Sequence, residues 1–193
     1  MSKHASDFAG LPVEAADENA LLRAALAEAQ KRISELERSS ESDPLTPLPS
    51  ARRFRAELER VVGLAERHGT TAAVVGIELT GLATVEERFG HFASDAAIVH
   101  VARLLCGLIR STDILARTGE RDFALILDHL DHNSAIDTGE RLARCIAENP
   151  LDLGHVRVTI EAAVATTGIM PGDVVEDVLA RSKRNLALAK AGD

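Results

Sequence analysis

The stretch that decides the fold of this chain is Arg110-Ser-Thr-Asp113 followed by Arg117-Thr-Gly-Glu-Arg-Asp-Phe123. Two short apolar runs, Ile114–Arg117 and Phe123–Leu127, flank the charged residues and have the length of strands. A charged turn with a glycine between two such runs predicts a β-hairpin. A helical pattern over Phe92–Arg110 comes before it, so the stretch predicts a helix followed by a hairpin.

Outside this stretch, helical and strand periods alternate along the chain. Helices show apolar residues at intervals of three and four, whereas a buried strand shows a continuous apolar run. The patterns predict helices over Ala51–His68, Phe92–Arg110, Ser134–Glu148 and Pro171–Ala191, and strands over Thr71–Leu79 and Val156–Thr166. Mixed strands and helices around one sheet give an α+β domain whose helices cover the sheet faces.

Composition and charge limit the classes of function. The chain has 193 residues, 46% of them hydrophobic and 27% charged, as in a globular domain with an appendage. A formal net charge of -8 argues against a nucleic-acid partner, because phosphate binding relies on clustered cations. The sequence has neither an apolar run of about 20 residues nor a signal-peptide pattern. We therefore expect no membrane span and a cytoplasmic location.

The N-terminal part predicts a dimerising helix. Residues 1–13 are expected to form a flexible tail, and residues 14–42 a coiled-coil helix and a polar joint before a domain at 43–193. In a heptad repeat over residues 14–38, the a positions are Asn19, Leu26 and Ile33, the d positions are Leu22, Ala29 and Leu36, and the g–e′ pairs are Glu18 with Arg23 and Arg32 with Glu37. This pattern favours a parallel homodimer. The alternative is an amphipathic helix that lies on its own domain.

Several segments with shared spacing resemble the GGDEF-domain family of diguanylate cyclases, bacterial enzymes of signal transduction that make cyclic di-GMP. They are the Arg110–Phe123 stretch, Asp43-Pro-Leu-Thr-Pro-Leu-Pro-Ser-Ala-Arg-Arg-Phe54, Gly76-Ile-Glu-Leu-Thr80, Phe89-Gly-His91 with Asp95, and Ala189-Lys190. The resemblance covers roughly residues 43–191. It implies a palm of the nucleotide-cyclase type, with a central, mostly antiparallel sheet flanked by helices.

The resemblance also implies that the catalytic turn is degenerate. Glu120 stands at the family's second glycine, Arg121 at its metal-binding acid and Asp122 at the Glu that follows. The strand-end acid that shares the metal is Glu78. A guanidinium supplies no oxygen ligand to magnesium, and Asp122 is not expected to replace it because adjacent hairpin residues face opposite sides. We expect no catalytic residue, no magnesium site and no enzyme activity.

The substrate positions that the family implies are only partly kept. Glu86 stands where the family has the Asn that reads the guanine base. Its partner Asp95 and the phosphate-contacting Lys190 remain. These two residues are therefore the candidates for a vestigial GTP site.

The positions that bind the product in the family are retained. Arg110 and Asp113 keep the family's distance to the turn, and in ungapped register Arg141 supplies a second arginine. The planar fork of arginine can bind a phosphate or a guanine edge and can stack on the base. The alternative assigns Arg110 to favouring a helix end, Asp113 to a turn and Arg141 to a solvated helix charge.

The sequence therefore predicts a catalytically inactive GGDEF-like signalling protein. It would bind cyclic di-GMP at Arg110, Asp113 and Arg141 and relay its occupancy to an unidentified protein partner. Two alternatives stay open: a nucleotide-independent scaffold or dimerisation module, and a weakly active diguanylate cyclase. Another candidate metal cluster, Asp128-His-Leu-Asp-His132, has the composition expected of an exposed loop.

Overall fold

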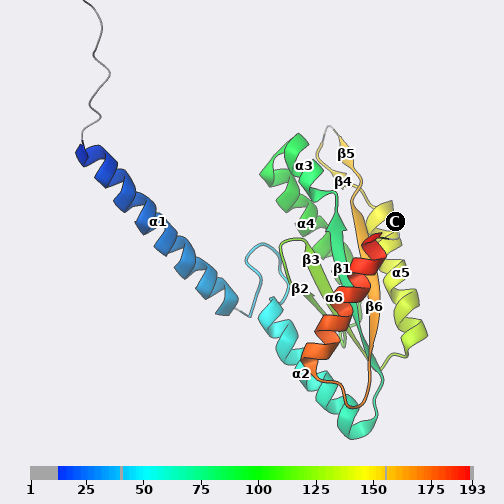
Figure 1. The fold of residues 1–193 in the computed structure, drawn as a ribbon. Helices are drawn as coiled ribbons and strands as arrows, with labels where there is room; N and C mark the ends of the chain where they lie inside the picture. Colours follow the sequence, from blue (N-terminus) through cyan, green and yellow to red (C-terminus); the bar gives the residue numbers. More distant parts are fainter. Residues whose placement is uncertain (1–12, 40, 155, 192–193) are drawn as a thin grey trace, which may run out of the picture. The chain divides into compact units, whose positions relative to one another are not determined.

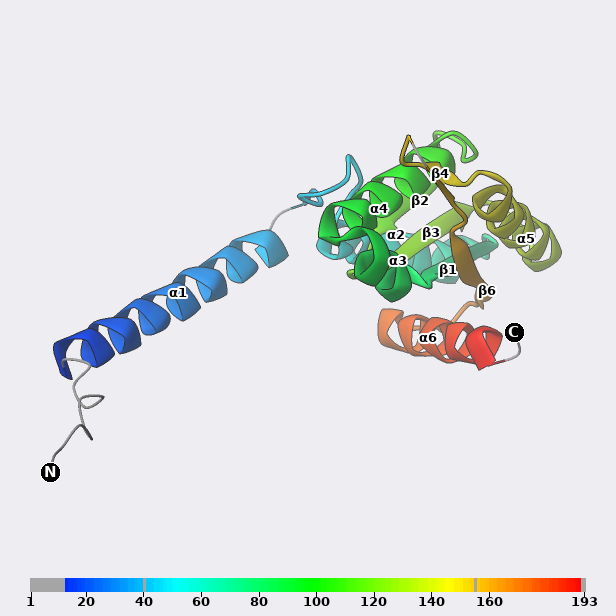
Figure 2. The same ribbon diagram turned by 90° about the horizontal axis from the view of Figure 1, so that it is seen from above.

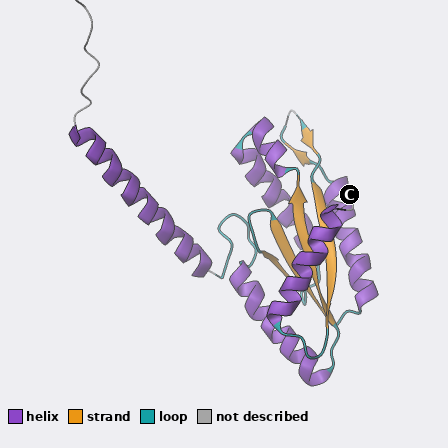
Figure 3. Cartoon of the chain, in the orientation of Figure 1, coloured by secondary structure: helices purple, strands orange, loops and turns teal. Residues whose placement is uncertain are grey.

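The apolar run Ala72-Ala-Val-Val-Gly-Ile-Glu-Leu-Thr80 forms β1, a central strand of the sheet in the computed structural model. The structure describes residues 13–39, 41–154 and 156–191. β1 (Ala72–Thr80) pairs with β3 (Asp122–Asp128) on one side and β6 (Glu161–Ile169) on the other, and β2 (Ile114–Arg117) pairs with β3. The four-stranded antiparallel sheet has the order β2-β3-β1-β6 (Figure 1, Figure 3).

Helices cover both faces of this sheet. They are α2 (Ala51–His68), α3 (Leu82–Phe89), α4 (His91–Cys106), α5 (His132–Glu148) and α6 (Val175–Ala191), and a small hairpin comprises β4 (Leu151–Asp152) and β5 (Arg157–Val158). Because side chains alternate along a strand, Val75 and Ile77 pack with α3, α4 and α5, whereas Ala72 and Val74 pack with α2 and α6. Figure 2 shows α4 and α6 on opposite sides of the sheet.

The predicted α+β class, with an antiparallel sheet flanked by helices, is confirmed. Helix α3 was not predicted; it begins after Gly81, whose φ of 76° suits a glycine. The strand expected over Val156–Thr166 is divided into β5 and β6. The last helix begins at Val175 rather than at Pro171.

The helix that precedes the hairpin is shorter than predicted. It ends at Cys106, so Arg110 lies in the following loop and not at a helix end. Gly107 is a weak helix former at this point. In addition, the Asp113 carboxylate accepts a hydrogen bond from the Arg110 backbone N–H at 2.8 Å. Such a local bond gives the backbone an alternative to helix, and the reading of Arg110 as a helix-end charge was therefore wrong.

Asp43 connects the opening loop of the domain to the hairpin. Its carboxylate accepts hydrogen bonds from the Leu45 N–H at 3.2 Å and from the Thr46 N–H and hydroxyl at 2.7 Å each. It also pairs with Arg117, whose Nη1 lies 3.1 Å from Asp43 Oδ2. The two side chains are only 13% (Arg117) and 10% (Asp43) exposed. Arg117 Nη2 also donates to the Glu120 carbonyl at 2.8 Å, so one guanidinium joins the loop to the turn.

The first unit of the chain consists of α1 (Val13–Ser39) and the residues before it. The side chains of Leu22, Leu26, Ile33 and Leu36, which form the predicted apolar stripe, are 62%, 59%, 54% and 70% exposed. The side chains of Glu18, Asn19 and Glu37 and residues 1–12 of the predicted tail lie outside the described residues. In the described part of the chain, no helix is both long and apolar enough to span a bilayer.

Asp43→Ala is expected to destabilise the domain by about 3 kcal/mol, because it leaves the mostly buried Arg117 guanidinium without its carboxylate. Urea unfolding measures this loss. Glu41→Ala is the matched control: its pair with Arg53 is exposed, so its loss should not exceed about 1 kcal/mol. Equal losses in the two variants would contradict a structural role for the Arg117–Asp43 pair.

Candidate functional sites

The three residues predicted to bind cyclic di-GMP line one cavity. Arg110 and Asp113 lie on the loop between α4 and β2, and Arg141 lies on α5. The cavity has a volume of ≈ 270 Å³, and its other lining residues are Gly107, Leu108, Ile109, Leu127, Asp128, Leu130 and Thr138. The fold therefore brings together charges from two separate elements. We call it the loop cavity.

Hydrogen bonds hold the loop beside α5. The Arg110 N–H donates to Asp113 Oδ2, and the Asp113 N–H donates to the Arg110 carbonyl at 3.1 Å, which closes a turn. Arg141 Nη2 donates to the Leu108 carbonyl at 3.3 Å. Within the described residues, neither arginine forms an ion pair with a carboxylate. Two guanidinium groups beside one cavity can accept an anionic ligand.

Sequence reasoning missed two polar residues of the loop cavity. Thr138 lies three residues before Arg141 on α5, and that helical spacing indicates a shared face. Asp128 ends β3, and its carboxylate lies 3.9 Å from Arg60 Nη2. The sequence analysis assigned Asp128 to an exposed loop, but its side chain is only 13% exposed.

A second cavity, of ≈ 500 Å³, lies on the other face of the sheet between α2 and α6. We call it the sheet cavity. Its charged lining residues are Arg55, Glu78, Asp122, Lys183 and Lys190. It therefore contains Glu78 and Asp122, two of the positions expected to be degenerate, and Lys190, one of the two candidate GTP residues. Asp95, the other candidate, is not part of its lining.

Glu78 and Asp122 face each other in this cavity. They are direct partners in the β1–β3 register. Lys190 Nζ donates to Glu78 Oε1 at 2.6 Å, whereas the Asp122 carboxylate makes no hydrogen bond or ion pair within the described residues. Burial and the neighbouring Glu78 carboxylate raise the pKa of Asp122, although nearby cations act in the opposite direction.

The orientation of Asp122 corrects the sequence-based expectation. Adjacent residues of the hairpin do face opposite sides, but Asp122 and not Arg121 faces Glu78. The Arg121 side chain is exposed and does not line the sheet cavity. Phe123 packs into the core on the α3–α5 side with 1% exposure, which places Asp122 on the α2–α6 side. Asp122 therefore stands where it was not expected, opposite Glu78, while the Arg121 charge still acts on the Asp122 carboxylate by lowering its pKa.

Gly119 of the turn lies close to the Asp122 side chain, so that a Cβ at this position would require the carboxylate to move. The backbone N–H groups of Thr118 and Gly119 donate to the Asp122 carbonyl at 2.8 and 3.3 Å. Glu120 is exposed and contributes its carbonyl to Arg117, as expected of a solvated hairpin tip.

The position that reads the base in the family carries two acids around a histidine. His91 Nδ1 lies 3.1 Å from Glu86 Oε1, and His91 Nε2 lies 3.6 Å from Asp95 Oδ2. All three side chains are at least 32% exposed. Glu86 supplies only acceptors when it is ionised, whereas an Asn also supplies donors. The structure therefore places Glu86 and Asp95 beside one histidine, and neither lines the sheet cavity that contains Lys190.

The family implies a magnesium ion beside Glu78, where the Lys190 ammonium already lies. Magnesium takes oxygen ligands in near-octahedral geometry, often one or two carboxylates with substrate phosphates. Glu78 and Asp122 are two such carboxylates, yet the Lys190 ammonium already contacts Glu78. Across the described ranges, no group of three or more His, Cys, Asp or Glu side chains could hold a metal ion. A magnesium ion at this pair of carboxylates would have to displace the Lys190 ammonium from Glu78.

Comparison with known proteins shows the family. The profile described as "Diguanylate cyclase, GGDEF domain" matches residues 40–193, and this chain therefore belongs to the GGDEF family. The bifunctional diguanylate cyclase/cyclic di-GMP phosphodiesterase MucR of Pseudomonas aeruginosa is 28% identical over 153 residues. That alignment covers 79% of this chain but only 22% of MucR, so the chain spans about a fifth of that relative.

Solved structures share the fold. The diguanylate cyclase SiaD of P. aeruginosa, in complex with its activator SiaC, has a TM-score of 0.76 at 22% identity, covering 93% of this chain and 72% of SiaD. The coiled coil and GGDEF domain of DgcB from Caulobacter crescentus, in complex with c-di-GMP, has a TM-score of 0.75 at 22% identity, covering 91% and 94% of the two chains. At these identities the likeness establishes the fold.

Asp122→Asn is expected to stabilise the protein at neutral pH. Because folding raises the pKa of Asp122, ionisation favours the unfolded state once the pH exceeds the unfolded-state pKa. The penalty vanishes below that pKa, where both states are protonated. The side chain is only half buried, so we expect a gain of less than about 1 kcal/mol.

Urea unfolding at about pH 7 and about pH 4 tests this, since Asp titrates near the lower value. The gain should shrink at the lower pH. Glu120→Gln, which removes an exposed acid of the same turn, is the control and should change little. A gain in the free energy of unfolding for Asp122→Asn that is equal at both pH values would contradict a raised pKa of Asp122.

Proposed function

We propose that this chain is a GGDEF-domain signalling protein that binds cyclic di-GMP at Arg110, Asp113 and Arg141 in the cytoplasm and does not synthesise it. The supporting observation is that these three residues line the loop cavity and that neither guanidinium is paired with a carboxylate in the described part of the chain. The structure of DgcB with c-di-GMP shows that a domain of this fold can hold the ligand.

The chemistry of the loop cavity suits both parts of the ligand. Cyclic di-GMP carries phosphates and guanines, and an arginine fork can bind either a phosphate or the guanine Hoogsteen edge. Asp113 uses Oδ2 for the Arg110 N–H, which leaves Oδ1 as an acceptor for guanine N1–H and N2–H₂. Arg141 approaches from α5, so the ligand would lie between the loop and the helix.

Arg110→Ala should weaken cyclic di-GMP binding at least about thirtyfold, because truncating one partner of a desolvated charged contact costs roughly 2 kcal/mol or more. Isothermal titration measures the dissociation constant. Arg141→Ala and Asp113→Asn should also weaken binding. Arg144→Ala, an exposed arginine of α5 outside the cavity, is the control and should bind normally.

The outcomes of that titration separate the alternatives. Wild-type binding that survives all three substitutions would place the ligand elsewhere. No binding by the wild-type protein would favour the nucleotide-independent scaffold or dimerisation module.

Absence of turnover is proposed on three grounds. The Lys190 ammonium contacts the Glu78 carboxylate and competes with any cation for it. Glu120 replaces a glycine at the turn, and Glu86 with its histidine contact alters base recognition. Each change acts against binding GTP in the family's geometry.

A weakly active diguanylate cyclase is the second candidate function. The observation in its favour is that Asp122 faces Glu78 across β1 and β3, so two carboxylates lie side by side although Arg121 stands at the family's ligand position. The curated relative MucR is named as a diguanylate cyclase. For this function Lys190 would have to release Glu78.

We expect no cyclic di-GMP from GTP with magnesium or manganese, as assayed by chromatography after long incubation. Lys190→Gln is a useful second sample because it frees Glu78 from its ion pair. Product made by the wild-type protein and abolished in both Glu78→Ala and Asp122→Asn would establish the cyclase instead. Product unaffected by those substitutions would point to a contaminating enzyme.

Signal relay is proposed to run through a homodimer and a protein partner. The exposed stripe of α1 supplies a seam for a parallel coiled coil over residues 14–38. The coiled coil of DgcB and the activator SiaC bound to SiaD support an arrangement of this kind. The partner itself is not identified by these features.

The double substitution Leu26→Lys and Ile33→Lys should convert the protein to a monomer, because it places like charges at neighbouring a positions of the seam. Light scattering gives the mass per particle. Lys31→Ala, at an exposed f position of the same helix, should leave the dimer intact. A dimer that persists in the double variant, and in a chain beginning at Ser42, would assign dimerisation to the domain.

A further inference from the structure

The sheet cavity is mostly apolar inside and charged at its mouth. Its inner wall is made of small and apolar residues from three elements: Val74 and Gly76 of β1, Ala124 of β3, and Leu179 and Leu186 of α6. Phe54 of α2 completes the wall. A cavity of several hundred cubic ångströms, largely apolar with a few polar groups, is typical of a small-molecule site. It lies on the face of the sheet opposite to the loop cavity.

A hydroxyl group on a mostly buried residue lines this cavity. Ser182 is 8% exposed and lines the cavity from α6. Its Oγ lies above Gly76, 3.2 Å from where a Cβ of that residue would be. Within the described residues no hydrogen bond of this hydroxyl is found, and its oxygen is not one of the fully buried atoms without a partner. The hydroxyl is therefore open to a hydrogen bond with a ligand oxygen in the cavity.

The charges at the mouth favour an anionic group. The charged lining comprises three cationic side chains (Arg55, Lys183 and Lys190) and two acidic ones (Glu78 and Asp122). The formal charge of the lining is therefore +1, whereas that of the whole chain is -8. Lys190 is paired with Glu78, and Arg55 with Glu176. Lys183 forms no ion pair in the described part of the chain. Its ammonium is therefore available to a ligand.

We propose that the sheet cavity binds a small amphiphilic carboxylate. Its aliphatic or aromatic body lies over Gly76 and Ala124, an oxygen on that body hydrogen-bonds to Ser182, and its carboxylate lies beside Lys183. This site is separate from the loop cavity and takes a different class of ligand. Binding there does not depend on cyclic di-GMP.

Three ten-carbon probes with different head groups test the charge: decanoate, 1-decanol and decylammonium, each below its micelle concentration. We expect saturable binding of one decanoate per full-length chain by isothermal titration, weaker binding of decanol and the weakest of decylammonium. Amide chemical shifts should change at Gly76, Ala124 and Ser182. Tighter binding of decylammonium, or shift changes centred on α4 and α5, would overturn the proposal.

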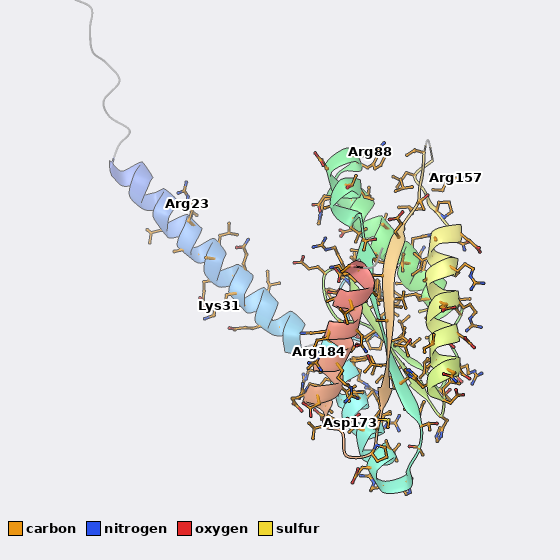
Figure 4. All side chains as sticks on the ribbon, turned by 45° about the vertical axis from the view of Figure 1, so that its right-hand side comes forward. Arg23, Lys31, Arg88, Arg157, Asp173 and Arg184 are labelled. Carbon is orange, nitrogen blue, oxygen red and sulfur yellow. The ribbon has the colours of Figure 1, made fainter. Side chains whose placement is uncertain are left out.

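Matched variants of α6 test the position of the ligand. Lys183→Gln should weaken decanoate binding about threefold to fivefold, as expected for an exposed charge contact, whereas Arg184→Gln should not change it. Arg184 is an exposed residue of the same helix outside the lining (Figure 4).

A second pair of variants tests whether the ligand body occupies the cavity. Ala187→Leu should fill part of the cavity and weaken decanoate binding, whereas its control Ala180→Leu, outside the lining, should not. Equal decanoate binding by the Ala187→Leu and Ala180→Leu variants would show that decanoate does not occupy the sheet cavity.

Hydroxylated probes test Ser182. Among hydroxydecanoates with the hydroxyl at successive chain positions, at least one should bind more tightly than decanoate. Ser182→Ala should remove that gain and leave decanoate binding unchanged. If every isomer binds no better than decanoate to the wild-type protein, Ser182 has no part in recognition. Binding of cyclic di-GMP should be the same in all these variants, so this test is independent of the proposed receptor function.

Discussion

The contacts of Arg117, with its ion pair to Asp43 at their centre, hold together two segments that are distant in the sequence, the opening loop and the hairpin turn. The Arg117 side chain reaches Asp43 of the opening loop and the Glu120 carbonyl of the hairpin turn, and its backbone N–H donates to the Pro49 carbonyl at 3.0 Å. Because β3 begins directly after this turn, the pair also fixes the start of β3 against β1. The opposition of Asp122 and Glu78 depends on that start.

The sheet separates two sites whose charged groups are paired to different extents. On the α4–α5 side, Arg110, Asp113 and Arg141 form no ion pairs in the described structure. On the α2–α6 side, the polar groups are partly satisfied by one another, as in the contact between Lys190 and Glu78. A site whose charges pair internally is a poor cation site, whereas one whose guanidinium groups stay unpaired can still take an anion.

The α+β fold could be predicted from sequence because it depends on local periods, and the resemblance to the GGDEF family implied that Arg110, Asp113 and Arg141 would form one cluster. The alternation of strand and helix patterns defines the α+β class, and the ungapped register placed Arg141 beside Arg110. The face of the sheet toward which the Asp122 side chain points depends instead on which residue closes the hairpin.

Strand alternation in the sequence already indicated this face. Glu78 lies between the core residues Ile77 and Leu79, and Asp122 lies next to the core residue Phe123, so both acids point away from that core and share the other face. The length of the preceding helix was not predictable, because a side-chain bond from Asp113 competes with it.

The position of bound cyclic di-GMP is the most direct test of the account. A crystal structure of the protein grown with cyclic di-GMP should show the ligand between the α4–β2 loop and α5, with guanidinium contacts from Arg110 and Arg141 and a guanine on Asp113. The sheet cavity should hold no nucleotide in that structure. A guanine nucleotide beside Glu78, Asp122 and Lys190 with the loop cavity empty would contradict the account and support a working substrate site.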